Sequence, residues 1–302
     1  MRSASTDVMA WYAASLGNNY ATPALLDIIS SPLTLNLIEQ ATMALVALVV
    51  LPAVQLAPLP SLSTIRKSGP SSILCMGLSN ALTCRLFMIS LKHLDVSLCH
   101  TIRACNPCCA AMIAMLNGQK LSSRRLCSLP LMLVGFAIAV AAEPSCSMLG
   151  VAAGIGSLIS LSALQHLTHY LTFEKGLPEM QVQMLQCSLC FVLLLPGLLS
   201  RGRAQDLRDA LIQSRKFQWL SLLNGASDYA ENVAATAACA SFAPVDFAVL
   251  DMLRRLIVII GCGMGARKNP AGMANVAGTL LVLAGALLYA RSGNTDDCQS
   301  AK

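Results

Sequence analysis

The sequence predicts an all-α integral membrane protein with about ten transmembrane helices. Hydrophobic residues make up 55% of its 302 residues and charged residues only 12%, about half the usual quarter of a soluble chain. The apolar residues come in blocks of roughly twenty, the length that crosses a bilayer as a helix. Since backbone amides inside a membrane must be paired within their own segment, each block is expected to be helical.

The predicted helices follow one another along the whole chain. The first seven residues are too short for a cleaved signal or transit peptide, so the first block is expected to remain as a membrane helix. Proline-containing breaks such as Ser31-Pro32, Gly69-Pro70 and Asn269-Pro270 separate later blocks, because proline rarely continues a helix. We expect one membrane domain over 1–302 with a polar tail at 292–302. The predicted spans are 7–28, 33–56, 70–91, 95–116, 125–142, 148–173, 178–199, 217–240, 244–266 and 271–290.

The two halves of the chain resemble each other faintly. Val134-Gly135-Phe136-Ala137 and Ala284-Gly285-Ala286-Leu287 begin two segments of similar pattern, about half a chain apart. Five helices per half is an odd number, so duplicated halves must lie in the membrane with opposite orientation. The sequence therefore predicts two inverted five-helix repeats, 1–145 and 146–291, an arrangement typical of secondary transporters.

The formal charge of +6 does not indicate nucleic-acid binding, because most basic residues lie in short loops rather than in a patch with aromatic residues. With ten spans, nine Lys and Arg residues fall on the N-terminal side of the membrane and eight on the other. The positive-inside rule therefore leaves the orientation open.

Nine ionisable residues within the predicted spans are the informative ones, since each costs roughly 2.5–3.5 kcal/mol near a helix centre. Arginine keeps its proton and matches phosphate with a bidentate fork, so converging arginines predict a phosphate or phosphosugar site. The alternative is internal neutralisation, since Asp251 precedes the adjacent pair Arg254 and Arg255 by three and four residues. The nine are Glu39, Arg85, Arg103, Asp228, Glu231, Asp246, Asp251, Arg254 and Arg255.

Polar residues also recur at helical spacing. Asn224, Asp228 and Glu231, joined by Asn232, line one face of the eighth span, and His100 lies one turn from Arg103. Both faces are expected to line a cavity. Another set, Gln165, His166 and His169, is expected to form ordinary helix–helix hydrogen bonds, and Gly135, Gly154, Gly156, Gly278 and Gly285 are expected to be close-packing points.

No metalloprotease, nucleophile-elbow or dinucleotide motif occurs in a context that would support it, so an enzyme is the weaker class. Most of the 13 cysteines fall inside apolar blocks, where cysteine behaves as a small polarizable side chain. The cluster Cys105-Asn106-Pro107-Cys108-Cys109 lacks a second ligand pair for a metal. We expect no catalytic residues, no metal ion and no cofactor. We expect membrane lipid to surround the protein, and a homodimer is a possible assembly.

Residues 90–107, Ser-Leu-Lys-His-Leu-Asp-Val-Ser-Leu-Cys-His-Thr-Ile-Arg-Ala-Cys-Asn-Pro, resemble a signature of the triose-phosphate translocator and nucleotide-sugar transporter family, in the drug/metabolite transporter superfamily. There the pattern is Ser-Leu, Val-Ser, His-Thr-(Ile/Val)-Lys-Ala and a proline. A second motif is similar to Ala243-Pro244-Val245 followed by a basic pair, here Arg254 and Arg255. The resemblance spans nearly the whole chain, with further matches at Trp11-Tyr12, Asn18-Asn19, Pro32-Leu33-Thr34-Leu35 and 278–289.

The resemblance implies an antiporter that exchanges a sugar phosphate, another organic phosphate or a nucleotide sugar for phosphate or a nucleotide monophosphate by alternating access. It implies that Arg103, Arg254 and Arg255 bind the phosphate, and a basic pair at the second motif is typical of the phosphosugar branch. The other expected substrate contacts are Glu231, Asn232, Asp228, His100 and Asn19.

The chain departs from the plastid phosphate translocators at several positions. Cys84 and Phe87 replace a His and a Thr, Glu231 stands where a Tyr is typical, and Tyr20 replaces a Lys. These departures argue against triose-phosphate specificity. Two alternatives remain: a proton-coupled exporter of amines or small metabolites, with Glu39 or Glu231 carrying the proton, and a transport-inactive scaffold. With no long transit segment, an endomembrane (Golgi or endoplasmic reticulum) is favoured over a plastid envelope.

Overall fold

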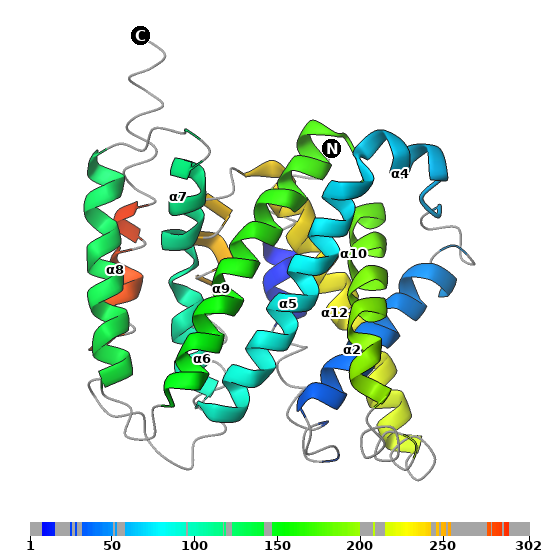
Figure 1. Cartoon of the computed structure of the whole chain (residues 1–302), viewed down its shortest axis with the longest axis horizontal. Coiled ribbons are helices and arrows are strands. Elements are labelled where there is room, and N and C mark those ends of the chain that lie inside the picture. Colours follow the sequence, from blue (N-terminus) through cyan, green and yellow to red (C-terminus); the bar gives the residue numbers. More distant parts are fainter. Residues whose placement is uncertain are drawn as a thin grey trace. The chain divides into compact units, whose positions relative to one another are not determined.

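The described secondary structure of the computed structural model consists of helices joined by turns (Figure 1). This confirms the all-α class, while the count of ten stays a prediction, because the first, ninth and tenth spans are described only in part. The structure describes residues 8–15, 25, 28, 32–50, 52, 58–94, 96–116, 118, 123–141, 147–199, 208, 215–242, 246–247, 249–251, 253–254, 277–278, 280–285 and 287–289.

The observed helices follow the predicted spans closely. The sixth span, predicted at 148–173, is α9 and a π-helical turn that ends at Glu174, and the third, predicted at 70–91, is α5. The elements are α2 (Pro32–Leu45), η1 (Val46–Val50), α4 (Leu62–Ser68), α5 (Pro70–His93), α6 (Val96–Ala104), α7 (Asn106–Leu116), α8 (Ser123–Ala141), α9 (Met148–His169), η2 (Tyr170–Glu174), α10 (Glu179–Leu194), η3 (Leu195–Leu199) and α12 (Arg215–Ser241).

Three of these helical segments are long and apolar enough to cross a membrane. They are Pro70–His93, Met148–Glu174 and Glu179–Gly197, and shorter apolar helices cover Thr34–Val49, Leu126–Ile138 and Leu280–Tyr289. The 27-residue α12 is long enough to cross a membrane but is too polar to be counted with these three segments. Its polar residues therefore need partners inside the protein.

The short helix α4 was not predicted, because at seven residues it carries no membrane-length signal. Ser61 caps its N-terminus and accepts a hydrogen bond from the backbone N–H of Thr64 at 3.1 Å, which satisfies one of the unpaired amides of the first turn. Gly69 ends it with φ of 87°, a conformation that glycine adopts at no steric cost. Pro70 then begins α5.

The fourth predicted span, 95–116, is interrupted. Helix α6 ends at Ala104 and α7 begins at Asn106, with a turn at Cys105. Pro107 is the physical reason, since it has no N–H to donate to the carbonyl of Arg103 and its ring clashes with that carbonyl in a continuous helix. The Cys108 N–H instead bonds the Cys105 carbonyl at 3.0 Å. The break places Arg103 in the last turn of α6.

The chain divides into two compact units. Unit 1 comprises Met1–Met88 and Leu164–Ser241, and unit 2 comprises Ile89–Ala163 and Phe242–Lys302. Each unit therefore takes segments from both halves of the sequence. The predicted repeats 1–145 and 146–291 describe a duplication of sequence rather than these units, and they stay a prediction.

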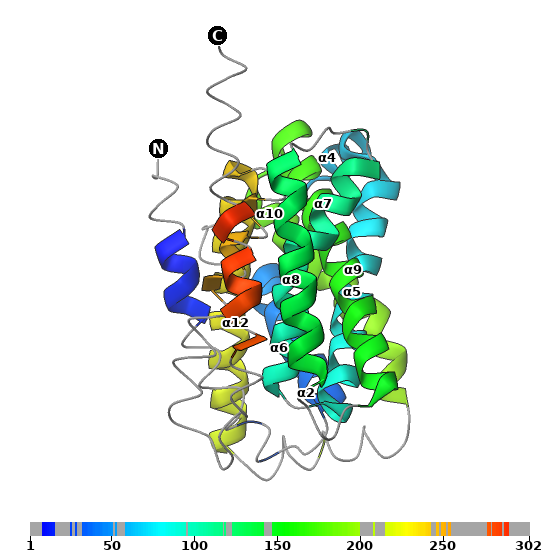
Figure 2. The same cartoon turned by 90° about the vertical axis from the view of Figure 1, so that its left-hand side faces the viewer.

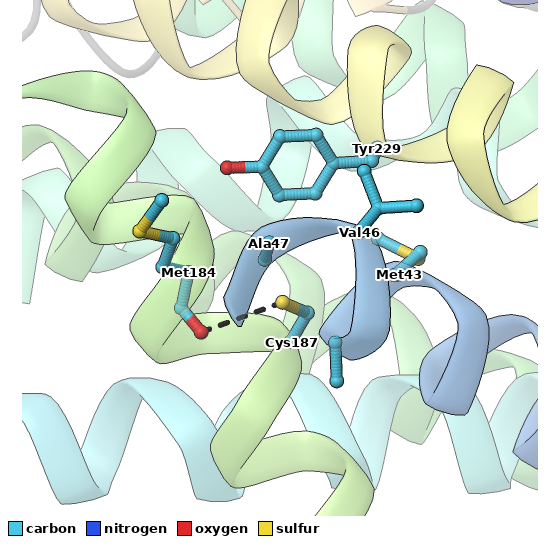
Figure 3. Packing of buried hydrophobic residues seen from close by; sticks show 7 residues of the cluster. Met43, Val46, Ala47, Met184, Cys187 and Tyr229 are labelled. Carbon is cyan, nitrogen blue, oxygen red and sulfur yellow. Dashed lines mark hydrogen bonds between the residues drawn. The ribbon is translucent and has the colours of Figure 1, made fainter. Parts of the chain in front are cut away.

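Unit 1 is built on the packing of α2 against α10 and α12. Met43 and Ala47 of α2 and η1 contact Met184 and Cys187 of α10 and Tyr229 of α12 (Figure 3). The Tyr229 hydroxyl donates to the Met180 carbonyl at 3.2 Å, so the ring is anchored at its polar end. This packing holds the polar residues of α12 at fixed positions beside α2.

In unit 2, α8 packs against the last helical segment, 277–289, through glycines (Figure 2). A Cβ at Gly135 would lie 2.7 Å from both the Gly278 carbonyl oxygen and the Val282 nitrogen, so the backbones touch. A Cβ at Gly285 would lie 3.1 Å from the carbonyl oxygen of Ser128 and 2.5 Å from Cγ of Met132. These glycines are confirmed as close-packing points.

The two contacts of α8 are reciprocal. If residue 135 corresponds to 285, as the repeat predicts, then Ser128 corresponds to Gly278 and Met132 to Val282. Gly135 thus contacts Gly278 and Val282, and Gly285 contacts their counterparts Ser128 and Met132. An internal two-fold axis between inverted repeats would produce this pairing, while the duplication itself stays a prediction.

Candidate functional site

The predicted site residues fall into two groups, one in each unit. His100, Arg103 and Arg254 belong to unit 2, and Asp228, Glu231 and Asn232 belong to unit 1. Arg255 and Asn19 lie outside the described residues.

Arg103 is held by α9. Its Nη2 donates to the hydroxyl of Ser157 at 3.3 Å, and Ser157 is completely buried. The guanidinium is partly buried at the C-terminal end of α6, where the helix dipole favours positive charge. His100 lies one turn earlier on α6 and is also partly buried.

A second contact fixes the interruption beside Arg103. The Ser162 hydroxyl of α9 donates to Oδ1 of Asn106 at 2.6 Å, and both side chains are completely buried. Gly154 lets Ile102 and Ser90 approach the same helix closely. Helix α9 therefore holds both sides of the Cys105 turn and sets the position of the guanidinium.

Ser157 and Ser162 were not predicted as site residues. The signal available in the sequence was the run of small residues between Gly154 and Ser162, which marks a face of α9 that another helix can approach closely. The sequence does not say which helix approaches, because the partners are more than 50 positions away.

Arg254 forms an ion pair with Asp251. This is the pair that their spacing of three residues predicted as the alternative to a contact with substrate. Its Nε and Nη2 both donate to Oδ1 of Asp251, at 3.1 and 2.8 Å. The two side chains are only 12% and 3% exposed. Asp251 therefore offsets the charge of Arg254 and fixes the plane of its guanidinium.

In unit 1 the polar face of α12 meets α2. The Nδ2 of Asn224 donates to Oε1 of Glu39 at 3.1 Å. Glu231 is buried, and its carboxyl lies close enough to Glu39 to interact with it electrostatically. Gly225 allows Thr42 to approach the backbone of α12. Glu39, which was predicted as an ionisable residue within a span and as a candidate proton carrier, is thus part of this polar group.

Asn232 and Asp228 contact each other along α12. The Asn232 Nδ2 donates to the Asp228 carbonyl at 2.7 Å and to its Oδ1 at 3.2 Å. This pair therefore stabilises one turn of its own helix. Their predicted contact with substrate stays a prediction.

In the polar set at the end of α9, His169 makes the predicted kind of helix–helix contact. His169 Nδ1 lies 2.9 Å from the Cys239 carbonyl oxygen of α12, which can accept its N–H, and the His169 ring stacks on Phe173. The Cys239 thiol in turn donates to the Gln165 carbonyl at 3.5 Å. These are helix–helix hydrogen bonds within unit 1.

Within the described residues, no group of three or more His, Cys, Asp or Glu side chains could hold a metal ion. The thiols of Cys105, Cys108 and Cys109 are free cysteines in that part of the chain. The guanidinium and amide groups described above can bind an anionic or hydroxyl-bearing ligand.

Known proteins resemble the chain over most of its length. The model of the Triose-phosphate Transporter family matches residues 4–290. Phosphoenolpyruvate/phosphate translocator 2, chloroplastic, of Arabidopsis thaliana is 24% identical over 291 residues, which cover 93% of this chain and 75% of that protein. A solved crystal structure aligns over 95% of both chains with a TM-score of 0.59 and 15% identity, a likeness of fold. The chloroplastic relative gives no support to the expected endomembrane location.

Proposed function

Because the chain belongs to the Triose-phosphate Transporter family, a family of multi-span membrane proteins, we propose that it is an antiporter of organic phosphates. It exchanges a sugar phosphate, a related organic phosphate or a nucleotide sugar for phosphate or a nucleotide monophosphate. Transport proceeds by alternating access, with no chemical change to the ligand.

The observation that carries this proposal is the placement of Arg103. Its guanidinium stands at the cationic position of the family motif, in the last turn of an interrupted helix, oriented by Ser157 at 3.3 Å. A guanidinium cannot lose its proton and binds phosphate oxygens through parallel N–H donors. An anion that binds there would offset the cost of keeping the charge in a membrane-spanning segment.

Arg254 would supply a second phosphate contact. Asp251 holds its guanidinium in one plane through two hydrogen bonds, which lowers the entropy lost when an anion binds. Arg255 is proposed for the same role on the resemblance alone. The predicted contacts of Asp228, Glu231, Asn232, His100 and Asn19 with the rest of the ligand remain part of the proposal.

The ligand class follows from charge and from the departures in sequence. Cys84 and Phe87 replace residues typical of triose-phosphate carriers, while the basic pair at 254 and 255 is kept. The Arabidopsis relative is named a phosphoenolpyruvate/phosphate translocator. A small phosphorylated acid is therefore the first organic phosphate to test, followed by sugar phosphates and nucleotide sugars.

The test is counterflow of labelled phosphate in liposomes that contain the purified protein. Arg254→Gln is expected to slow exchange, whereas Arg85→Gln, at an exposed position of α5, is the matched control and should exchange at the rate of the parent. If Arg254→Gln exchanges phosphate as fast as the parent, the assignment of this arginine is wrong. Uptake of a cation driven by pH and unaffected by phosphate would favour the exporter alternative instead.

A further inference from the structure

Glu39 places a carboxyl group in the middle of α2, on the side that packs against α12. Asn224 donates to it at 3.1 Å, and the carboxyl of Glu231, two turns further along α12, interacts with it electrostatically. Asn224 and Glu231 are 1% and 8% exposed. Glu39 itself is partly buried, so two carboxyl groups and one amide share a largely buried region inside unit 1.

The groups that face Glu39 from the helices packed around it are acidic or neutral within the described residues. Two like charges in a buried region repel each other strongly, and each also loses its hydration. Binding a proton to one carboxyl removes the repulsion and the dehydration cost of that carboxylate. The titratable groups that interact with Glu39 are Glu231 on α12 and Cys84 on α5.

Asn224 shows where such a proton would be accepted. Its Nδ2 is used by Glu39, but its Oδ1 is buried and has no hydrogen-bond partner in the described part of the chain. Buried acceptors in proteins are normally paired. A protonated Glu39 has an O–H to donate, so a carboxylic acid and an amide side by side can satisfy each other's donor and acceptor. The unpaired acceptor is the complement of a proton on Glu39.

We propose that Glu39 is a proton-binding site and that its proton is carried in the same direction as the phosphate anion. On one side of the membrane the Glu39 carboxylate takes a proton from water and becomes a carboxylic acid. On the other side the O–H bond breaks and the proton returns to water. The proton cancels one negative charge as the anion adds one, so the loaded protein crosses with less uncompensated charge. This inference rests on the proposed phosphate transport.

The transport test is the rate of phosphate–phosphate exchange in liposomes that have the same pH inside and outside, measured at a series of pH values. Relative to Glu39→Gln, whose side-chain amide is neutral at every pH, the exchange rate of the parent is expected to fall about tenfold per pH unit once Glu39 loses its proton, since one pH unit is a tenfold difference in proton activity. Glu174→Gln, at an exposed residue of η2, should show the same pH dependence as the parent. Identical pH profiles for the parent and Glu39→Gln would overturn the proposal.

Two outcomes separate this proposal from the transport function. Absence of phosphate–phosphate exchange in the parent at every pH would refute phosphate transport alone. Infrared spectroscopy of the purified protein near neutral pH then decides on the proton. We expect a carbonyl band of a protonated carboxyl group that Glu39→Gln removes and Glu174→Gln retains. A spectrum in which Glu39→Gln removes only a carboxylate band would contradict a proton on Glu39.

Discussion

Replacing Asp251 by Asn should destabilise the protein by about 3 kcal/mol. The carboxylate accepts two hydrogen bonds from Arg254, at 2.8 and 3.1 Å, and both side chains are nearly buried. A hydrogen bond to a charged group contributes about 1.5–3 kcal/mol, and removing one partner of a buried ion pair costs about 3–5 kcal/mol. Asn keeps an oxygen that can accept one bond, so the lower end of that range applies.

The measurement is the free energy of unfolding in mixed micelles, by denaturant titration of the parent, Asp251→Asn, Arg254→Gln and the double variant. Removing both partners leaves no uncompensated charge, so the double variant should recover much of the loss, with a coupling energy on the order of 2 kcal/mol. If Arg254 binds phosphate, added phosphate should stabilise Asp251→Asn more than the parent, because the guanidinium then lacks its acid. An Asp251→Asn protein within about 0.5 kcal/mol of the parent would refute this reasoning.

Two further predictions concern the guanidinium at position 103 and the glycine contacts of α8. Ser157→Ala removes the 3.3 Å contact that orients Arg103, and it should raise the KM for phosphate roughly tenfold, in proportion to about 1.4 kcal/mol of lost hydrogen bonding. An unchanged KM in initial-rate uptake would show that the hydroxyl does not position the guanidinium. Gly135→Ala and Gly285→Ala insert a methyl group where the neighbouring atoms lie 2.5–3.1 Å away, so each should cost about 1–3 kcal/mol of unfolding free energy. Because the two contacts are reciprocal, the two losses should be similar, and a loss in only one variant would count against the repeat.

The parts of the fold that depend on local sequence could be predicted. Helix α5 begins at Pro70 as expected, because the Gly69-Pro70 break is encoded in two adjacent residues. The pairing of Asp251 with Arg254 follows from a spacing of three on one helix. The interruption of the fourth span at Cys105 was not predicted, although Pro107 lies two residues further on. Proline is tolerated within many membrane helices, and hydropathy alone does not reveal such a break.

Contacts between distant segments could not be predicted in the same way. The Asn224 and Glu39 side chains are 185 positions apart, and Arg103 and Ser157 are 54 apart. Periodicity identified the polar face of α12, but it does not say which helix that face meets. From the sequence, Glu39 is an ionisable residue within a span and a candidate proton carrier, and only the packing of α2 on α12 identifies Asn224 as its partner.

The most direct test of phosphate transport through the arginines is the rate of labelled phosphate counterflow for the parent, Arg103→Gln and Arg103→Lys. If the positive charge at position 103 binds phosphate, Arg103→Gln should lower kcat/KM roughly 10- to 100-fold, equivalent to about 1.5–3 kcal/mol for a charged hydrogen bond. Arg103→Lys, which keeps the charge, should retain most of the rate. Counterflow by Arg103→Gln at the parental rate would contradict the assignment of this residue as a phosphate ligand.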